Sequence, residues 1–211
     1  MSRTFLLSWV IAMGGAIKVP EFKVEEKVVL PSNKTCVIVV DMQNDFVDPK
    51  GALYVKGAEK IVPIIRSLIE KARKTDVLVI YTMDTHMEDD IEFSIWPKHT
   101  VEGSWGWQIV DELRPEKRDI IVRKMRYDAF FGTPLDHILR VRNIEYVVVC
   151  GVVANICVLH TAGSAALHGY KVVFPIDATV ALNDFDYYAA IRQVSFLYRG
   201  IITRSTEIEF R

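Results

Sequence analysis

The sequence has few cysteines and no excess of charge of either sign. Its three Cys among 211 residues form no disulfide framework or C-x-x-C pair, which indicates reduced thiols in a cytoplasmic protein and argues against a redox function. Lys plus Arg (26) balances Asp plus Glu (27), for a net charge of −1. This balance argues against binding to nucleic acid or to an anionic membrane.

The sequence also lacks a long hydrophobic run, an internal repeat and a low-complexity linker. The first 18 residues hold one apolar run, 5–13, which superficially resembles a signal peptide and is too short to cross a bilayer as a helix. We expect residues 1–18 to be an extension outside the core. Residues 19–211 are enough for a single domain with a full core.

Short β-branched runs alternate with segments of helical periodicity, which predicts a parallel sheet with helices on both faces. The run 36–40 is continuously apolar, as in a strand buried on both sides. The segment 58–74 carries apolar residues along one helical face. Further strands are expected at 77–81, 120–122, 146–150, 172–176 and 201–203, and further helices at 135–141, 156–168 and 184–198.

Chemically active side chains follow four of these strands. Asp41 comes after the first strand, Asp84 and His86 after the second, and Lys124 after the third. Cys157 opens the helix after the fourth strand. Because ligands of open α/β sheets bind beyond the carboxyl ends of the strands, an acid, a metal-type pair, a base and a thiol are expected at one rim.

Cys157 is the candidate nucleophile, since a helix N-terminus and a nearby lysine lower the pKa of a thiol. Its alternative is a small core residue, which is the interpretation we give to Cys36 and Cys150. His160 lies three residues further along the same helix, so a Cys–His dyad is conceivable, although a structural role is expected.

Asp84, His86 and His99 are candidate metal ligands. Side chains two residues apart in extended chain point the same way, so the first pair can reach one ion, and His99 lies in the same irregular loop. Carboxylate and imidazole suit Zn, Fe or Mn. Such a pair can equally stabilise a loop; Glu92 is a further acidic candidate.

Lys124 has two interpretations. Buried beside Asp41 and Cys157, it would stay charged only if paired. The alternative is a surface lysine in a basic run with Arg123 and Arg126.

Four ordered segments together resemble the isochorismatase-like cysteine hydrolases, and among these the nicotinamidase branch. The resemblance extends from about residue 33 to the C-terminus. The segments are VIVVDMQNDFV around Asp41, DTH…WPKHTVEGSWG from Asp84 to Gly106, KMRYDAFFGT from Lys124 and GVVANICVLHTA around Cys157.

The resemblance implies a three-layer α/β/α fold with a six-stranded, doubly wound parallel sheet. It implies a catalytic triad of Asp41, Lys124 and Cys157. It also implies a cis peptide between Val152 and Val153, with the backbone N–H groups of Val153 and Cys157 as oxyanion donors.

The same resemblance implies one divalent metal, zinc foremost with Fe or Mn as alternatives, held by Asp84, His86 and His99. Glu92 would approach it directly or through water. Relatives of this kind are commonly homo-oligomers.

Phe46 and Trp96 occupy the positions of aromatic pocket walls in the family, and ordinary core packing is their alternative. Phe130 and Phe131 stand where many nicotinamidases place a tyrosine over the pocket. The sequence departs from the family at Val153-Ala154-Asn155, where Ala-Thr-Asp is usual, and at Ser104, where Thr is usual.

The expected function is deamidation of nicotinamide to nicotinate and ammonia through a cysteine thioester, with the metal orienting the pyridine ring. One alternative is a cysteine hydrolase of another small amide, such as a ureido or carbamoyl compound. The other is a catalytically silent ligand-binding member of the family.

Overall fold

The computed structural model describes residues 9–12 and 15–211. Its centre is a sheet of six parallel strands in the order β6-β5-β4-β7-β8-β9. The chain starts at β4, adds β5 and β6 on one side, and then adds β7, β8 and β9 on the other side. This order confirms the prediction of a doubly wound α/β fold. The strands are β4 (Thr35–Val40), β5 (Leu78–Asp84), β6 (Ile120–Lys124), β7 (Tyr146–Gly151), β8 (Lys171–Pro175) and β9 (Ile201–Thr203).

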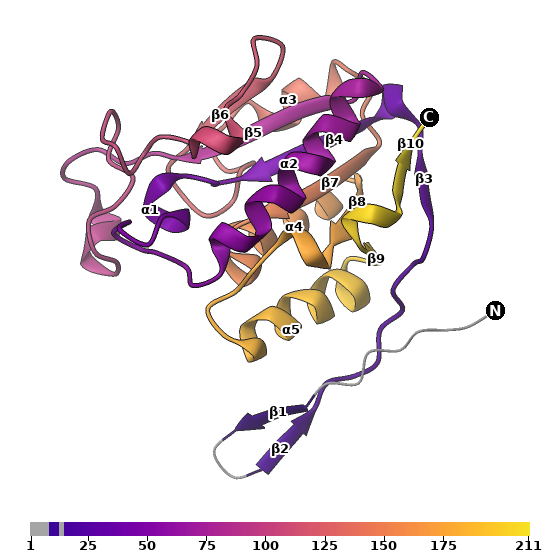
Figure 1. The fold of residues 1–211 in the computed structure, drawn as a ribbon, viewed down its shortest axis with the longest axis horizontal. Helices are drawn as coiled ribbons and strands as arrows, with labels where there is room; N and C mark the ends of the chain where they lie inside the picture. Colours follow the sequence, from indigo (N-terminus) through magenta and orange to yellow (C-terminus); the bar gives the residue numbers. More distant parts are fainter. Residues whose placement is uncertain (1–8, 13–14) are drawn as a thin grey trace.

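Helices flank the sheet on both faces (Figure 1). The long helix α2 (Ala58–Lys74) packs against β4, β5 and β7, whereas α4 (Leu159–Leu167) packs against β7 and β8. The apolar side of α2, which includes Ile61, Ile65 and Leu68, is buried as its periodicity predicts. The remaining α-helices are α1 (Asn44–Val47), α3 (Leu135–Arg140) and α5 (Asp184–Arg192).

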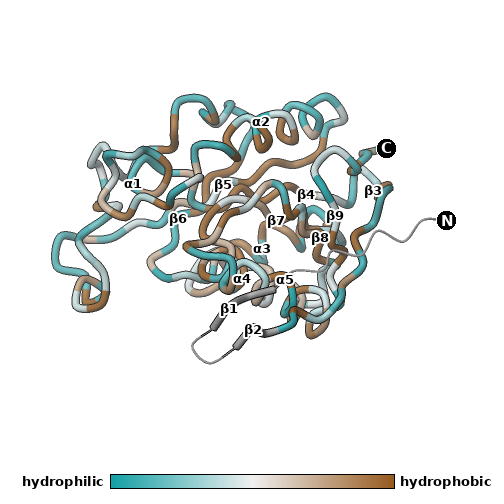
Figure 2. Tube along the Cα trace, turned by 60° about the horizontal axis from the view of Figure 1, so that its bottom comes forward, coloured by the Kyte–Doolittle hydropathy of each residue, from teal (hydrophilic) through white to brown (hydrophobic). Residues whose placement is uncertain are grey.

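The core lies along the central strands. Every residue of β4 is buried, and so is every residue of β7 after the first. Figure 2 shows the hydrophobic colouring concentrated on these strands and the hydrophilic colouring on the outer loops. A strand buried on both faces has no polar alternation, which is why continuous apolar runs marked the strands in the sequence.

Two features of the fold differ from the sequence prediction. The helix expected from residue 156 begins at Ala154 with a π-helical turn, Ala154–Val158, before α4. A small parallel pair outside the main sheet, β3 (Val28–Leu30) with β10 (Ile208–Phe210), was not predicted. Val28 and its partner Ile208 are 180 residues apart in the sequence, so no local pattern signals this pairing.

The predicted extension, residues 1–18, lies partly outside the described residues. Its described parts form an antiparallel hairpin of β1 (Trp9–Ala12) and β2 (Gly15–Lys18), which stands apart from the sheet in Figure 1. Among the described residues, no helix is long and apolar enough to cross a membrane.

Candidate active site

The strand order brings the predicted site residues to one edge of the sheet. Asp84 and Lys124 are direct neighbours across β5 and β6. Asp41 follows β4 on the other side of β5, and the turn that carries Cys157 follows β7, next to β4. Four adjacent strand ends therefore contribute to the site.

Gly151 permits the close contact between β7 and β4. Its φ of +115° is unfavourable for other residues, and a Cβ there would lie 2.1 Å from the carbonyl oxygen of Val40. The Val152–Val153 peptide that follows is cis, as the family resemblance implied. The chain then enters the π-helical turn that carries Cys157.

Asp41, Lys124 and Cys157 meet in a buried cluster. The Lys124 ammonium lies 2.7 Å from Asp41 Oδ2, 2.9 Å from Asp84 Oδ1 and 3.5 Å from Cys157 Sγ. The hydroxyl of Thr82 donates to Asp41 Oδ1 at 2.6 Å. Since Lys124 is 1% exposed and bridges two carboxylates, the surface-lysine alternative does not hold.

Burial and charge separate the pKa values of the two carboxylates. Burial raises the pKa of Asp41, and Lys124 offsets this only in part. Burial would also raise the pKa of Asp84, but Lys124 and hydrogen bonds from two histidines hold it well below its usual range. Two neighbouring carboxyl groups with divergent pKa values can take different roles: Asp84 stays ionised, and Asp41 can accept a proton.

The same cluster shifts the pKa values of the cation and the thiol. Burial would lower the pKa of Lys124, but Asp41 and Asp84 hold it well above its usual range, so the ammonium stays charged. Contrary to the lowered pKa expected from the sequence, burial raises the pKa of the Cys157 thiol; Lys124 opposes this, while the two carboxylates add to it. The thiol therefore needs a base to release its proton.

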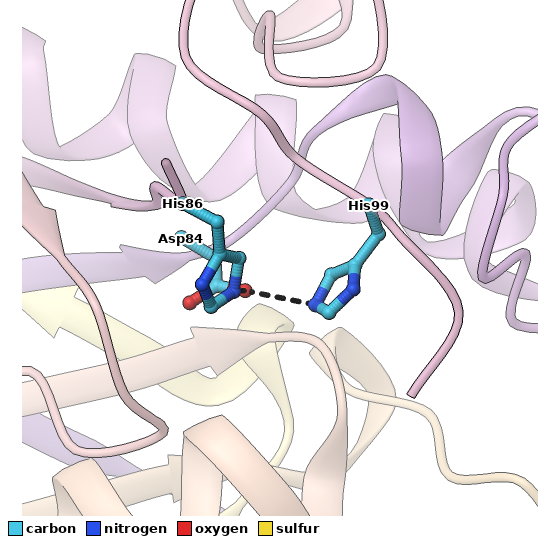
Figure 3. A group of neighbouring side chains, drawn as sticks. All are labelled: Asp84, His86 and His99. Atoms are coloured by element: carbon cyan, nitrogen blue, oxygen red, sulfur yellow. Dashed lines mark hydrogen bonds and ion pairs between the residues drawn. The ribbon is translucent and has the colours of Figure 1, made fainter. Parts of the chain in front are cut away.

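Asp84, His86 and His99 form a second cluster beside the first. One ligand atom from each lies within 4.8 Å of the other two, and all three side chains are buried. Nε2 of His86 lies 3.0 Å and Nε2 of His99 lies 3.4 Å from the same oxygen, Asp84 Oδ2. Figure 3 shows both imidazoles beside this carboxylate.

The Nδ1 atom of each imidazole also has a protein oxygen as its hydrogen-bond partner. Nδ1 of His86 lies 3.0 Å from Asp90 Oδ2, and Nδ1 of His99 lies 2.7 Å from the carbonyl oxygen of Pro97. Metal-binding histidines are typically oriented in this way, with one nitrogen fixed by an oxygen and the other free for the metal. The donor set therefore fits a divalent cation.

The acidic groups around His86 support this fit. Burial would lower the pKa of His86, but hydrogen bonds to Asp84 and Asp90 raise it to about 9. The site thus attracts positive charge to the place where the ligand atoms converge, and a bound cation would supply that charge.

A small cavity of about 70 Å³ connects the two clusters. Phe46, Trp96 and Tyr127 give it three aromatic walls, and the indole N–H of Trp96 donates to the Tyr127 hydroxyl at 3.0 Å. The complete lining is Phe46, Leu53, Val55, Asp84, Glu92, Trp96, His99, Tyr127, Val153, Ile156, Cys157 and Leu182.

Phe130 and Phe131, predicted as pocket residues, lie outside this lining. They follow Tyr127 in a turn that is closed by a hydrogen bond from Phe131 N–H to the Asp128 carbonyl. Phe130 stacks on His168 with ring centroids 5.1 Å apart, and Phe131 is 67% exposed. Tyr127 lines the cavity instead. Its position three residues after Lys124 could have indicated this from the sequence.

The structure also shows the positions of His160, Glu92 and the other two cysteines. His160 is exposed and its Nδ1 contacts the Ile156 carbonyl oxygen of its own helix at 2.7 Å, so it forms no dyad with Cys157. Glu92 is buried and lines the cavity, but it is not part of the three-residue cluster of converging ligand atoms. Cys36 and Cys150 are core residues, as expected.

Comparison with known proteins agrees with this architecture. Residues 35–207 match the isochorismatase domain model. The ureidoacrylate amidohydrolase RutB of Azorhizobium caulinodans is 32% identical over 205 residues, covering 84% of this chain and 89% of the relative.

Two solved structures are similar along almost their whole length. The N-carbamoylsarcosine amidase of Thermoplasma acidophilum has a TM-score of 0.77 and 38% identity, covering 83% of this chain and 99% of its own. The pyrazinamidase of Pyrococcus horikoshii in complex with zinc has a TM-score of 0.73 and 31% identity, covering 84% and 98%. The domain model covers most of the chain, and the relatives and the six-stranded parallel sheet agree with it. The chain therefore belongs to the isochorismatase family of hydrolases.

Proposed function

We propose that the protein is a cysteine amidohydrolase that deaminates a neutral aromatic carboxamide, with nicotinamide as the first candidate. The observation that carries this proposal is the lining of the cavity. Cys157 lines it together with Asp84 and His99, two of the three candidate metal ligands, and aromatic side chains form its walls. A flat ring between these walls would present its amide to the thiol. The resemblance of this chain to a pyrazinamidase supports the same substrate class.

The charge of the lining favours a neutral substrate. Of the described residues, no Lys or Arg lines the cavity, whereas Asp84 and the buried Glu92 do. In the metal-free cavity, a substrate carboxylate would face these two acidic groups, and the cations beside them are already paired: Lys124 lies 2.9 Å from Asp84 Oδ1, and Arg126 lies 3.7 Å from Glu92 Oε2. Burying an unpaired charge is costly, so an uncharged amide is expected.

In the proposed reaction, Asp41 takes the proton of the Cys157 thiol, and Lys124 stabilises the resulting thiolate. The sulfur forms a bond to the amide carbon, and the oxyanion accepts hydrogen bonds from the N–H groups of Val153 and Cys157. Such a donor is typically worth about 3–4 kcal/mol. Asp41 returns its proton to the departing ammonia as the carbon–nitrogen bond breaks.

The remaining thioester reacts with water. Asp41, again a carboxylate, accepts a proton from the attacking water. As the carbon–sulfur bond breaks, Asp41 passes this proton to the departing sulfur and the Cys157 thiol is restored. The products are a carboxylic acid and the free Cys157. The net reaction consumes one water and releases one ammonia.

Asp84, His86 and His99 would hold the metal, for which zinc is the first candidate and Fe or Mn the alternatives. When bound, the ion would supply a Lewis acid that orients a ring nitrogen of the substrate. Asp84 connects the two clusters, because its Oδ1 pairs with Lys124 and its Oδ2 faces the histidines.

A second candidate is hydrolysis of a ureido or carbamoyl amide. It is favoured by the similarity of this chain to a ureidoacrylate amidohydrolase and to an N-carbamoylsarcosine amidase. Both named substrates carry a carboxylate, which the acidic lining of the cavity does not favour.

A substrate panel separates the candidates. Ammonia release by purified, zinc-supplemented protein is measured with nicotinamide, pyrazinamide, ureidoacrylate and N-carbamoylsarcosine. We expect turnover of the two aromatic carboxamides, lost in Cys157→Ala. Turnover restricted to the two carboxylate-bearing substrates would overturn the aromatic assignment, and no turnover of any amide would favour a catalytically silent protein.

A further inference from the structure

Two buried side chains directly after β4 have no part in the proposed reaction. Gln43 is 0% exposed and Asp45 is 8% exposed. A polar side chain withdrawn from water must find hydrogen-bond partners within the protein. The main partners of both are main-chain atoms of the segments that carry the metal ligands.

Gln43 holds the main chain of Asp84 at both of its polar groups. The N–H of Asp84 donates to Gln43 Oε1 at 2.8 Å, and Gln43 Nε2 donates to the Asp84 carbonyl at 2.8 Å. The same nitrogen donates to the carbonyl of Trp107, also at 2.8 Å. The side-chain amide of Gln43 thus connects Asp84, a candidate metal ligand, to the main chain of Trp107.

Asp45 holds the peptide that follows His99. Its Oδ2 accepts from the N–H of Thr100 at 2.7 Å, and its Oδ1 accepts from the N–H of Ala52 at 3.0 Å. Thr100 has a φ of +42°, which is unfavourable for a β-branched residue. Its carbonyl accepts from the N–H of His86 at 3.1 Å, so Asp45 stabilises the arrangement of both ligand histidines.

We propose that Gln43 and Asp45 are positioning residues for the metal. Gln43 fixes the main chain of Asp84 and Asp45 fixes that of His99, so the ligands converge before the ion binds. A preorganised site loses less freedom on binding, which increases affinity. The inference rests on the metal site of the proposed function, and it assigns a second task to the segment that also supplies Asp41.

The test is calorimetric titration of the metal-free protein with Zn²⁺, without substrate. Gln43→Glu keeps the acceptor for Asp84 N–H and loses both donations; Asp45→Ala loses both acceptors. We expect each to weaken zinc binding about 10- to 100-fold, the usual effect of removing an outer hydrogen-bond partner of a metal site. Asp45→Asn, which retains an acceptor oxygen for Thr100 N–H, should restore most of the affinity.

Asn44→Ala is the matched control. Asn44 lies between the two residues, and its side chain donates only to the Trp105 carbonyl, at 2.9 Å, away from the ligands. Its zinc affinity should equal that of the wild type. Thermal unfolding in chelator measures the stability of each metal-free variant separately.

Wild-type zinc affinity in Gln43→Glu and Asp45→Ala, with only the unfolding temperature lowered, would show a purely structural role and overturn the proposal. If Asp45→Ala does not fold, Gln43→Glu decides alone by the same criterion. A wild type that releases ammonia without binding zinc overturns this inference and leaves the hydrolase. A wild type that binds zinc but hydrolyses no amide overturns the proposed function alone.

Discussion

At the scale of single residues, the buried carboxylates of the site depend on the positive charge of Lys124. It is the counter-charge of two carboxylates, Asp41 and Asp84, in a place where water has almost no access. Lys124→Met keeps the length of the side chain and removes the charge. We expect the metal-free variant to lose about 3–5 kcal/mol of unfolding free energy, the usual cost of breaking a buried pair.

Urea unfolding of the metal-free wild type and variant measures this loss. Lys34→Met is a suitable control, because Lys34 pairs with Glu145 at the surface, where an ion pair contributes little. Equal stability of Lys124→Met and the wild type would mean that the cluster is not charged as described.

The reactivity of Cys157 should depend on pH in a defined direction. In the metal-free protein, burial raises the pKa of this thiol above its ordinary value of 9.0, so the protonated, unreactive form dominates at neutral pH. The rate of alkylation by iodoacetamide should therefore increase with pH and still be rising at pH 9. Cys157→Ala is the control, since burial also raises the pKa values of Cys36 and Cys150. A plateau reached below pH 7 would instead indicate a preformed thiolate.

Of the candidate site residues, those with distinctive chemistry could be predicted from the sequence, whereas those that contribute main-chain contacts could not. Asp41, Lys124 and Cys157 stood out because each follows a strand with a reactive group. Gln43 and Asp45 did not, because their partners lie 41 and 55 residues away and leave no spacing pattern. The structure was needed to show them.

At the scale of elements, the loop from residue 99 to 107 packs so closely on α1 that Gly106 has no room for a side chain. A Cβ at Gly106 would lie 2.1 Å from the carboxylate of Asp45. Gly106→Ala should displace Asp45 from Thr100, lower the unfolding free energy by about 1–3 kcal/mol and weaken zinc binding.

Gly103→Ala separates this steric effect from backbone strain. Gly103 has a φ of +83°, and a Cβ added there would meet no atom within 4 Å, so its substitution costs about 1–2 kcal/mol through the backbone alone. Chemical unfolding and zinc titration of both variants provide the comparison. Unchanged zinc affinity in Gly106→Ala would contradict the link between this loop and the metal ligands.

The elements themselves were predictable to the extent that they are long and buried. The apolar run in β4 and the amphipathic pattern of α2 determined those elements within a residue. The π-helical turn Ala154–Val158 could not be predicted, because it depends on contacts such as the hydrogen bond from Ala154 N–H to the Val180 carbonyl. Tertiary contacts of this kind override local propensity.

At the scale of the whole molecule, the core should be independent of the N-terminal extension. The sheet and its helices, together with β3 and β10, all lie after residue 27. A chain that begins at Val19 is therefore expected to retain the unfolding midpoint and the zinc affinity of the full chain. A large loss of stability in this truncated chain would show that residues 1–18 belong to the domain.

The central claim is that Cys157 forms a covalent intermediate with an amide substrate. Its most direct test is acid quenching of the zinc-loaded protein during turnover of nicotinamide, followed by mass spectrometry of the peptide that contains Cys157. The account predicts a nicotinoyl adduct on this peptide, and no adduct or ammonia release with Cys157→Ala. Ammonia release by Cys157→Ala at the wild-type rate would contradict it.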